Sequence, residues 1–226
     1  MIALELHQRI IENKDWAAIV FVLALGLVAL AKTAFENRFH DFSRLIVSDK
    51  YLKIYKESSH LMSGFTILLF IVNLISLSFF IQMILYHFGN ETKTEWLKSD
   101  WLLFIRIFTL LSVFILSKFL IEKIIAAIFG IEEIIESFNL QKVSFRTFVG
   151  LLLLPVSVVL FYNNFSTNSL ILTIILILLA INILTYLISL RIYQNLIISN
   201  LFYFILYLCA LEIAPYYFIY YLIKTN

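Results

Sequence analysis

A single carboxylate interrupts the most apolar part of the chain. Glu212 lies within the segment LYLCALEIAPYYFIYYLI, residues 206–223, which contains no other charged residue. On insertion scales a charge at the centre of a membrane helix costs about 2.5–3.5 kcal/mol, and such residues commonly mark substrate paths, proton relays or ion pairs. The carboxyl group of Glu212 can stay neutral, because burial favours the uncharged form, or it can pair with a cation.

One basic residue is placed to be that cation. Arg106 lies five residues after Trp101 in a second apolar segment, where its guanidinium can either reach Glu212 or extend to the lipid headgroups. Pro215 follows the acid by three residues and predicts a helix kink, which is found both in transporter binding sites and in packed structural helices. Three further intramembrane residues can form hydrogen bonds between helices: Asn73, Gln82 and Asn182.

The composition requires lipid as the solvent for these residues. Hydrophobic residues make up 62% of 226 positions and charged residues 14%, and the mean hydropathy is +0.95. A soluble domain is nearer half apolar and a quarter charged. The formal net charge of +2 gives no support for a nucleic-acid partner. We therefore expect an integral membrane protein whose first partner is the lipid bilayer.

No pattern in the chain indicates an enzyme, a cofactor or a metal site. Cys209 is the single cysteine, which excludes an internal disulfide and a cysteine-based metal cluster. The four histidines fall at or beyond the edges of the apolar segments, and there is no HExxH motif or phosphate-binding loop. The prediction is a protein without catalytic residues, cofactor or metal.

The apolar runs predict about six transmembrane helices in a single integral membrane domain, residues 1–226. Because the runs are long and do not alternate with polar residues, they indicate helices rather than a barrel. The fold class is therefore all-α, a polytopic helix bundle. The first run ends in Ala-x-Ala, as a signal peptide does, but acidic residues precede it, so we expect it to be retained. The predicted spans are residues 16–35, 61–88, 101–121, 145–162, 169–190 and 201–223.

Lysines and arginines predict the orientation of the bundle. Eleven of the 17 lie in or at the edge of the first, third and fifth loops, five lie on the opposite side, and Arg106 lies within a span. Positive loops remain in the cytoplasm, so both termini are predicted outside it. Tryptophans agree with this assignment, because all three fall at the predicted outer boundary: Trp16, Trp96 and Trp101.

The first cytoplasmic loop contains a short amphipathic pattern. Phe35, Phe39 and Phe42 recur at helical spacing among basic residues. Such a helix either lies in the headgroup region beside anionic lipid or simply packs under the bundle. The candidates for contact with anionic lipid are Arg38, Arg44 and Lys50.

The third loop contains an apolar seam with acidic flanks. The pattern predicts an amphipathic cytoplasmic helical extension after span three, which Gly130 can bend. An acidic face is poorly suited to anionic lipid, so the expected contact is protein: a second copy, another subunit, or the basic first loop. Because glycines number only five and no GxxxG occurs, we expect packing on Leu, Ile and Phe. The partner-docking candidates are Ile121, Ile124, Ile128, Ile131, Ile135 and Phe138, within residues 121–138.

Three stretches resemble one group of membrane proteins. They are FENRFHDFSRLIVSDKYLKIY (35–55), VSFRTFVGLLLLPVSVVLFY (143–162) and the closing segment 206–223, with its Leu-Glu-x-x-Pro core. Over nearly the whole chain they are similar to small multi-pass proteins of Bacteroidota known only as a domain of unknown function. The resemblance implies a bacterial inner-membrane location and brings no activity or catalytic residue.

Three functions remain open at this point. The first is a non-enzymatic integral subunit or scaffold of a membrane assembly, in contact with partners through its cytoplasmic loops. The alternative is a small proton-coupled or solute transporter that uses Glu212 and the Pro215 kink. The third is a membrane enzyme that acts on lipid, for which the loops offer only scattered polar residues.

Overall fold

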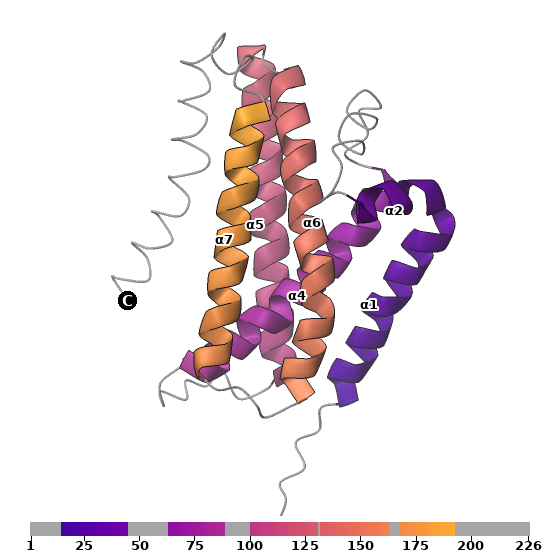
Figure 1. Ribbon diagram of the computed structural model, residues 1–226, viewed down its shortest axis with the longest axis vertical. Helices are drawn as coiled ribbons and strands as arrows, with labels where there is room; N and C mark the ends of the chain where they lie inside the picture. Colours follow the sequence, from indigo (N-terminus) through magenta and orange to yellow (C-terminus); the bar gives the residue numbers. More distant parts are fainter. Residues whose placement is uncertain (1–14, 45–62, 89–99, 131, 163–167, 193–226) are drawn as a thin grey trace, which may run out of the picture.

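The described part of the chain is entirely helical (Figure 1). The structure, a computed structural model, describes residues 15–44, 63–88, 100–130, 132–162 and 168–192, and no strand occurs within them. The prediction of an all-α polytopic bundle is confirmed. The helices are α1 (Asp15–Ala34), α2 (Glu36–Ser43), α4 (Gly64–Phe88), α5 (Asp100–Phe129), α6 (Glu132–Tyr162) and α7 (Asn168–Ile192).

Four of these helices are long and apolar enough to cross a membrane: α1, α4, α5 and α6. In α7 the apolar run extends from Ser169 to Thr185. These five helices lie on the first five predicted spans, while the sixth, residues 201–223, lies outside the described residues. The short helix α2 follows α1 after a single residue and occupies part of the predicted first loop.

The extension predicted after span three is present, but it forms a hairpin of two helices. With 30 residues, α5 is about 45 Å long at 1.5 Å per residue, longer than a bilayer core of about 30 Å. Gly130 ends it with φ +66°, a left-handed conformation that commonly terminates helices, and α6 then runs back along α5. Figure 1 shows the joined ends of α5 and α6 extending beyond α2. The apolar seam is therefore divided between two helices, not carried by one bent helix.

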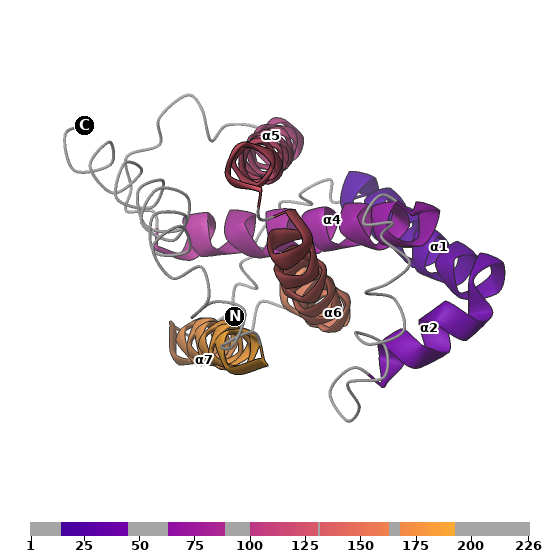
Figure 2. The same cartoon turned by 90° about the horizontal axis from the view of Figure 1, so that it is seen from above.

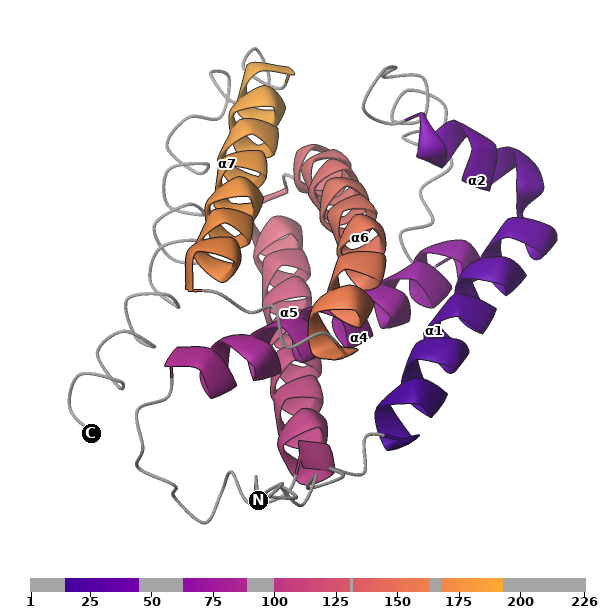
Figure 3. The same cartoon turned by 60° about the horizontal axis from the view of Figure 1, so that its bottom comes forward.

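The steeply inclined helix α4 occupies the centre of the bundle. Seen from above, α5, α6 and α7 are nearly end-on, whereas α4 lies across them (Figure 2). Figure 3 shows the same helix passing between α5 and α6. It packs most extensively on α6 and also contacts α1 and α5. More than half of its apolar span is buried, a larger share than in any other described span.

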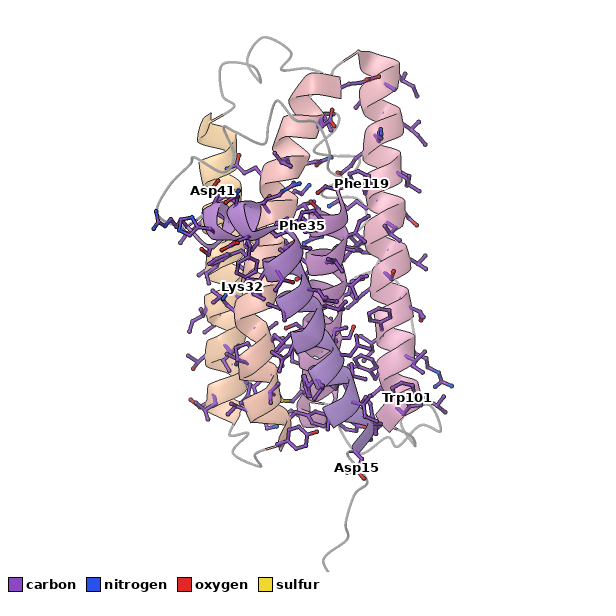
Figure 4. The ribbon with its side chains drawn as sticks, turned by 90° about the vertical axis from the view of Figure 1, so that its right-hand side faces the viewer. Asp15, Lys32, Phe35, Asp41, Trp101 and Phe119 are labelled. Atoms are coloured by element: carbon purple, nitrogen blue, oxygen red, sulfur yellow. The ribbon has the colours of Figure 1, made fainter. Side chains whose placement is uncertain are left out.

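Aromatic side chains join four helices at one end of the bundle. Phe79 of α4 is 1% exposed, and its ring lies 4.1 Å from Phe21 of α1, 4.5 Å from Phe104 of α5 and 5.4 Å from Phe161 of α6. Trp16 stacks on the same ring at 5.7 Å. We call these five residues the aromatic core. Figure 4 places its end of the bundle near Asp15 and Trp101, with Asp41 and Phe119 toward the other end.

A second cluster attaches α2 to the bundle at that other end. Phe42 is 1% exposed and meets the rings of Phe65 on α4 and Phe148 on α6 edge to face, at 5.6 and 5.7 Å. Phe35 and Phe39 pack against the same cluster. The phenylalanines of the first loop therefore face protein in this structure.

One glycine corrects the expectation that close glycine contacts are absent. Gly150 of α6 faces Asn73 of α4, and a Cβ atom at position 150 would lie 2.9 Å from the Cβ of Asn73. Asn73 is 1% exposed, so α4 and α6 cross at this pair. Small residues permit close helix crossing without a GxxxG motif, because one glycine on one partner is enough to admit the facing side chain.

Candidate functional site

A group of charged side chains lies between α5 and α6, two of them buried and two half-buried. Glu122 of α5 is 3% exposed and accepts a hydrogen bond from Nζ of Lys142 on α6, with 3.4 Å between Nζ and Oε1. Lys118, one turn before Glu122, is 9% exposed. Arg146, one turn after Lys142, is half-buried. Two i, i+4 pairs on facing helices thus converge, because these spacings place both members of a pair on one side of a helix.

The position of these charges along α5 suits one edge of a hydrocarbon layer. From Trp101 to Lys118 the rise along α5 is about 26 Å, close to the thickness of a bilayer core. Charged groups avoid that core, so the level of Lys118 and Glu122 is the natural boundary with the headgroups. The part of α5 that follows Glu122 extends past this boundary.

Two adjoining cavities open beside the charged group. The first, about 40 Å³, lies between α5 and α6 and is lined by Lys118, Glu122, Asn139, Lys142 and Arg146 together with three apolar residues. The second is larger, about 110 Å³, and it reaches α4, where its lining is apolar apart from Thr66. Both cavities share the same three apolar residues, Ile115, Phe119 and Val143. The two cavities therefore adjoin, one with a charged lining and one with an apolar lining, and we call the pair the α5–α6 cleft.

The predicted docking seam is partly exposed. Ile121, Ile124 and Ile128 of α5 are 46%, 58% and 72% exposed. By contrast, Ile135 of α6 is 3% exposed, so it belongs to the interior of the hairpin. Two of the predicted residues are not placed: Ile131 lies outside the described residues, and so does the side chain of Phe138.

The basic residues of the first loop have different environments. Arg38 of α2 donates hydrogen bonds to Oγ of Ser63 at 2.7 Å and to Oγ1 of Thr66 at 3.5 Å, and its guanidinium lies 5.1 Å from the centre of the Phe65 ring. This side chain is therefore directed toward the start of α4. Arg44 is exposed, and Lys50 lies outside the described residues.

The intramembrane polar residues fall into three situations. Gln82 of α4 donates a hydrogen bond across to the backbone carbonyl of Asp100 at 3.0 Å, and Tyr86 bonds to the carboxylate of the same residue. Asn182 instead donates to the carbonyl of Leu178 in its own helix, at 2.8 Å. Asn73 is buried against Gly150, as described above.

The role of the intramembrane acid Glu212 remains a prediction. Glu212 and Pro215 lie outside the described residues, while Arg106 is exposed near the start of α5. The pairing of Arg106 with Glu212, and the transporter hypothesis that depends on the acid, therefore stay predictions.

The sequence alone did not predict that the cleft residues meet. Lys118, Lys142 and Arg146 are among the eleven basic residues that predict the orientation, and Glu122 is one of the acids that flank the seam after span three. The available signal was the spacing Lys118–Glu122 in one apolar helix and Lys142–Arg146 in the next. That two such pairs face each other follows from the turn at Gly130.

One comparison with known proteins gives a match. A family model covers residues 17–223, nearly the entire chain, and its description reads Domain of unknown function (DUF4271). No curated protein and no solved structure matches the chain.

Proposed function

The chain belongs to the DUF4271 family, and for this integral membrane protein we propose a non-enzymatic role as a subunit or scaffold of a membrane assembly. The partner binds the exposed isoleucine seam of α5, defined as Ile121, Ile124 and Ile128. The observation that carries this proposal is the exposure of these three side chains, of which Ile121 lies at the charged level of Lys118 and Glu122 while Ile124 and Ile128 lie beyond it.

The position of the seam relative to the membrane boundary favours contact with protein rather than with lipid. Leu110 and Val113 of α5 are also exposed, and because they come between Trp101 and Lys118, we expect lipid to cover them. Ile124 and Ile128 come after the charged boundary, so lipid tails no longer cover them. A contiguous apolar stripe in that position is typical of an interaction site.

The spacing of the isoleucines and the charge of the hairpin indicate what kind of partner fits the seam. Residues at positions i, i+3 and i+7 form a stripe along one side of a helix, which suits a second helix with its own apolar seam. Glu132 and Glu136, at the start of α6, are exposed on the same hairpin. A second copy would bring its own acids to the contact, so we propose a different subunit whose apolar helix is flanked by basic residues.

Substitution of the seam is expected to release that partner. In the chain extracted from native membranes with a mild detergent, Ile124→Asn combined with Ile128→Asn should lower the co-purified partner at least tenfold, because about 1.4 kcal/mol of lost contact already gives that factor. Lys123→Asn is the matched control, at the same level but off the stripe, and should retain the partner. The measurement is the native mass of the complex.

The mass of the unmodified chain can contradict the proposal directly. If the unmodified chain has the mass of a single chain in every mild detergent and carries no protein with a basic-flanked apolar helix, the seam is not a docking site. A mass of two identical chains that the double substitution abolishes would assign the seam to self-association instead.

We further propose that the hairpin lies in the cytoplasm of a bacterial cell and that the membrane is the inner one. The eleven-to-five distribution of Lys and Arg supports this orientation, and the resemblance described above supports the location. A phosphatase that is active only outside the cytoplasm, fused after Asn226, is expected to be active. Fluorescence from a cytoplasm-specific reporter at the same site would reverse the orientation.

A further inference from the structure

We propose that the α5–α6 cleft binds one phospholipid with an anionic headgroup. The phosphate lies against Lys142 and Arg146, and an acyl chain follows the apolar cavity toward α4. This inference is independent of the proposed partner, because the cleft and the isoleucine seam use different residues.

The charge of the cleft suits a phosphate. Its lining contains three cationic side chains and one carboxylate, which leaves a net charge of two positive units. The carboxylate side chain of Glu122 is 5% exposed and contacts Lys142 at 3.4 Å, so it holds that ammonium group at the cavity. Because these side chains are partly removed from water, the net positive charge of the lining attracts an anion more strongly than the same charge would in bulk water.

The shape of the cleft suits an amphiphile. The charged cavity of about 40 Å³ is larger than the about 10–15 Å³ that one water molecule needs, so it has room for the oxygens of a phosphate. Directly beside it, the apolar cavity of about 110 Å³ continues between α5 and α4 to Ile67 and Phe70. Ile115, Phe119 and Val143 line both cavities, so a single molecule can occupy them together.

The level of the cleft matches the position of a lipid phosphate. Lys118 and Glu122 lie about one bilayer core from Trp101, at the headgroup boundary derived above. Leu116, which lines the apolar cavity, is 46% exposed, so part of this lining can be reached from outside the bundle. The adjoining apolar cavity favours a lipid over a soluble anion, which has no acyl chain to fill it. The buried Lys118 favours a specific site over diffuse attraction of lipid to surface lysines.

The test compares two phospholipids on the full-length chain in detergent by native mass spectrometry. Phosphatidylglycerol is expected to bind about tenfold more tightly than the zwitterionic phosphatidylcholine. Arg146→Gln should weaken the binding of phosphatidylglycerol by about fivefold or more, because it removes one charge-assisted contact with the phosphate. Lys123→Gln removes the same charge from an exposed position one residue after Glu122, outside the cleft, and should change nothing.

A second variant probes the apolar part of the cleft. Ile67 is 48% exposed, so Ile67→Trp should fold normally while its larger side chain fills the path of the acyl chain. We expect weaker binding of phosphatidylglycerol, with any binding of inorganic phosphate unchanged. This variant also decides the question if thermal melting shows that Arg146→Gln is unfolded.

Three results would overturn the inference. Equal losses for Arg146→Gln and Lys123→Gln would indicate diffuse surface attraction. Inorganic phosphate that displaces phosphatidylglycerol at millimolar concentration, with Ile67→Trp having no effect, would make the cleft a site for a soluble anion. Equal affinity for the two phospholipids would leave the charges without a role in binding.

Discussion

Phe79→Ala is expected to lower the free energy of unfolding by about 2–4 kcal/mol, one of the two largest effects of a single substitution in this bundle. Phe79 is 1% exposed and its ring contacts side chains from three other helices, so its removal leaves a cavity where α1, α4, α5 and α6 meet. In soluble proteins the same change costs about 3–5 kcal/mol. We expect less here, because lipid tails are as apolar as the interior and only the packing contribution is lost.

The measurement is equilibrium unfolding in mixed detergent micelles, with Leu110→Ala as the matched control. Leu110 is 69% exposed on α5 and faces lipid, so its truncation should change stability by less than about 0.5 kcal/mol. Phe79→Leu should fall between the two, because it keeps part of the volume but none of the ring contacts. Equal stability of Phe79→Ala and Leu110→Ala would show that the aromatic core does not hold these helices together.

Gly150→Leu is expected to cost about 3 kcal/mol or to prevent assembly of α4 on α6. A Cβ atom at position 150 would lie 2.7 Å from Cγ and 2.9 Å from Cβ of Asn73. Because the Cβ of Asn73 itself is too close, rotation of its side chain gives no relief, and one of the two backbones must move. Even Gly150→Ala should be destabilising, although alanine is the better helix former by about 1 kcal/mol.

Gly26→Leu is the matched control for this substitution. Gly26 lies on α1, and a Cβ atom there would meet nothing within 4 Å. Its replacement should therefore leave stability unchanged or raise it slightly, because leucine has a higher helix propensity than glycine at an exposed position. Stability of Gly150→Leu equal to that of Gly26→Leu in the same unfolding assay would disprove the close crossing of α4 and α6.

The amino-acid pattern alone determined the class of this protein and the approximate position of its spans. Hydropathy is a sum over neighbouring residues, so runs such as 16–35 and 169–190 indicate membrane helices without knowledge of their partners. The described helices α1 and α7 begin and end within a few residues of those runs. The extension after span three was visible for the same reason, because its apolar period continues past the length that a bilayer needs.

Only the tertiary structure decided which polar residues meet. Asn182 and Gln82 look equivalent in the sequence, yet one bonds to its own helix and the other to the start of α5. The difference depends on how each helix is rotated and inclined in the bundle. Contacts between side chains that are far apart in the sequence determine that rotation and inclination. The left-handed turn at Gly130 likewise brings Glu122 to Lys142, 20 residues further along, and so creates a cleft that no local pattern contains.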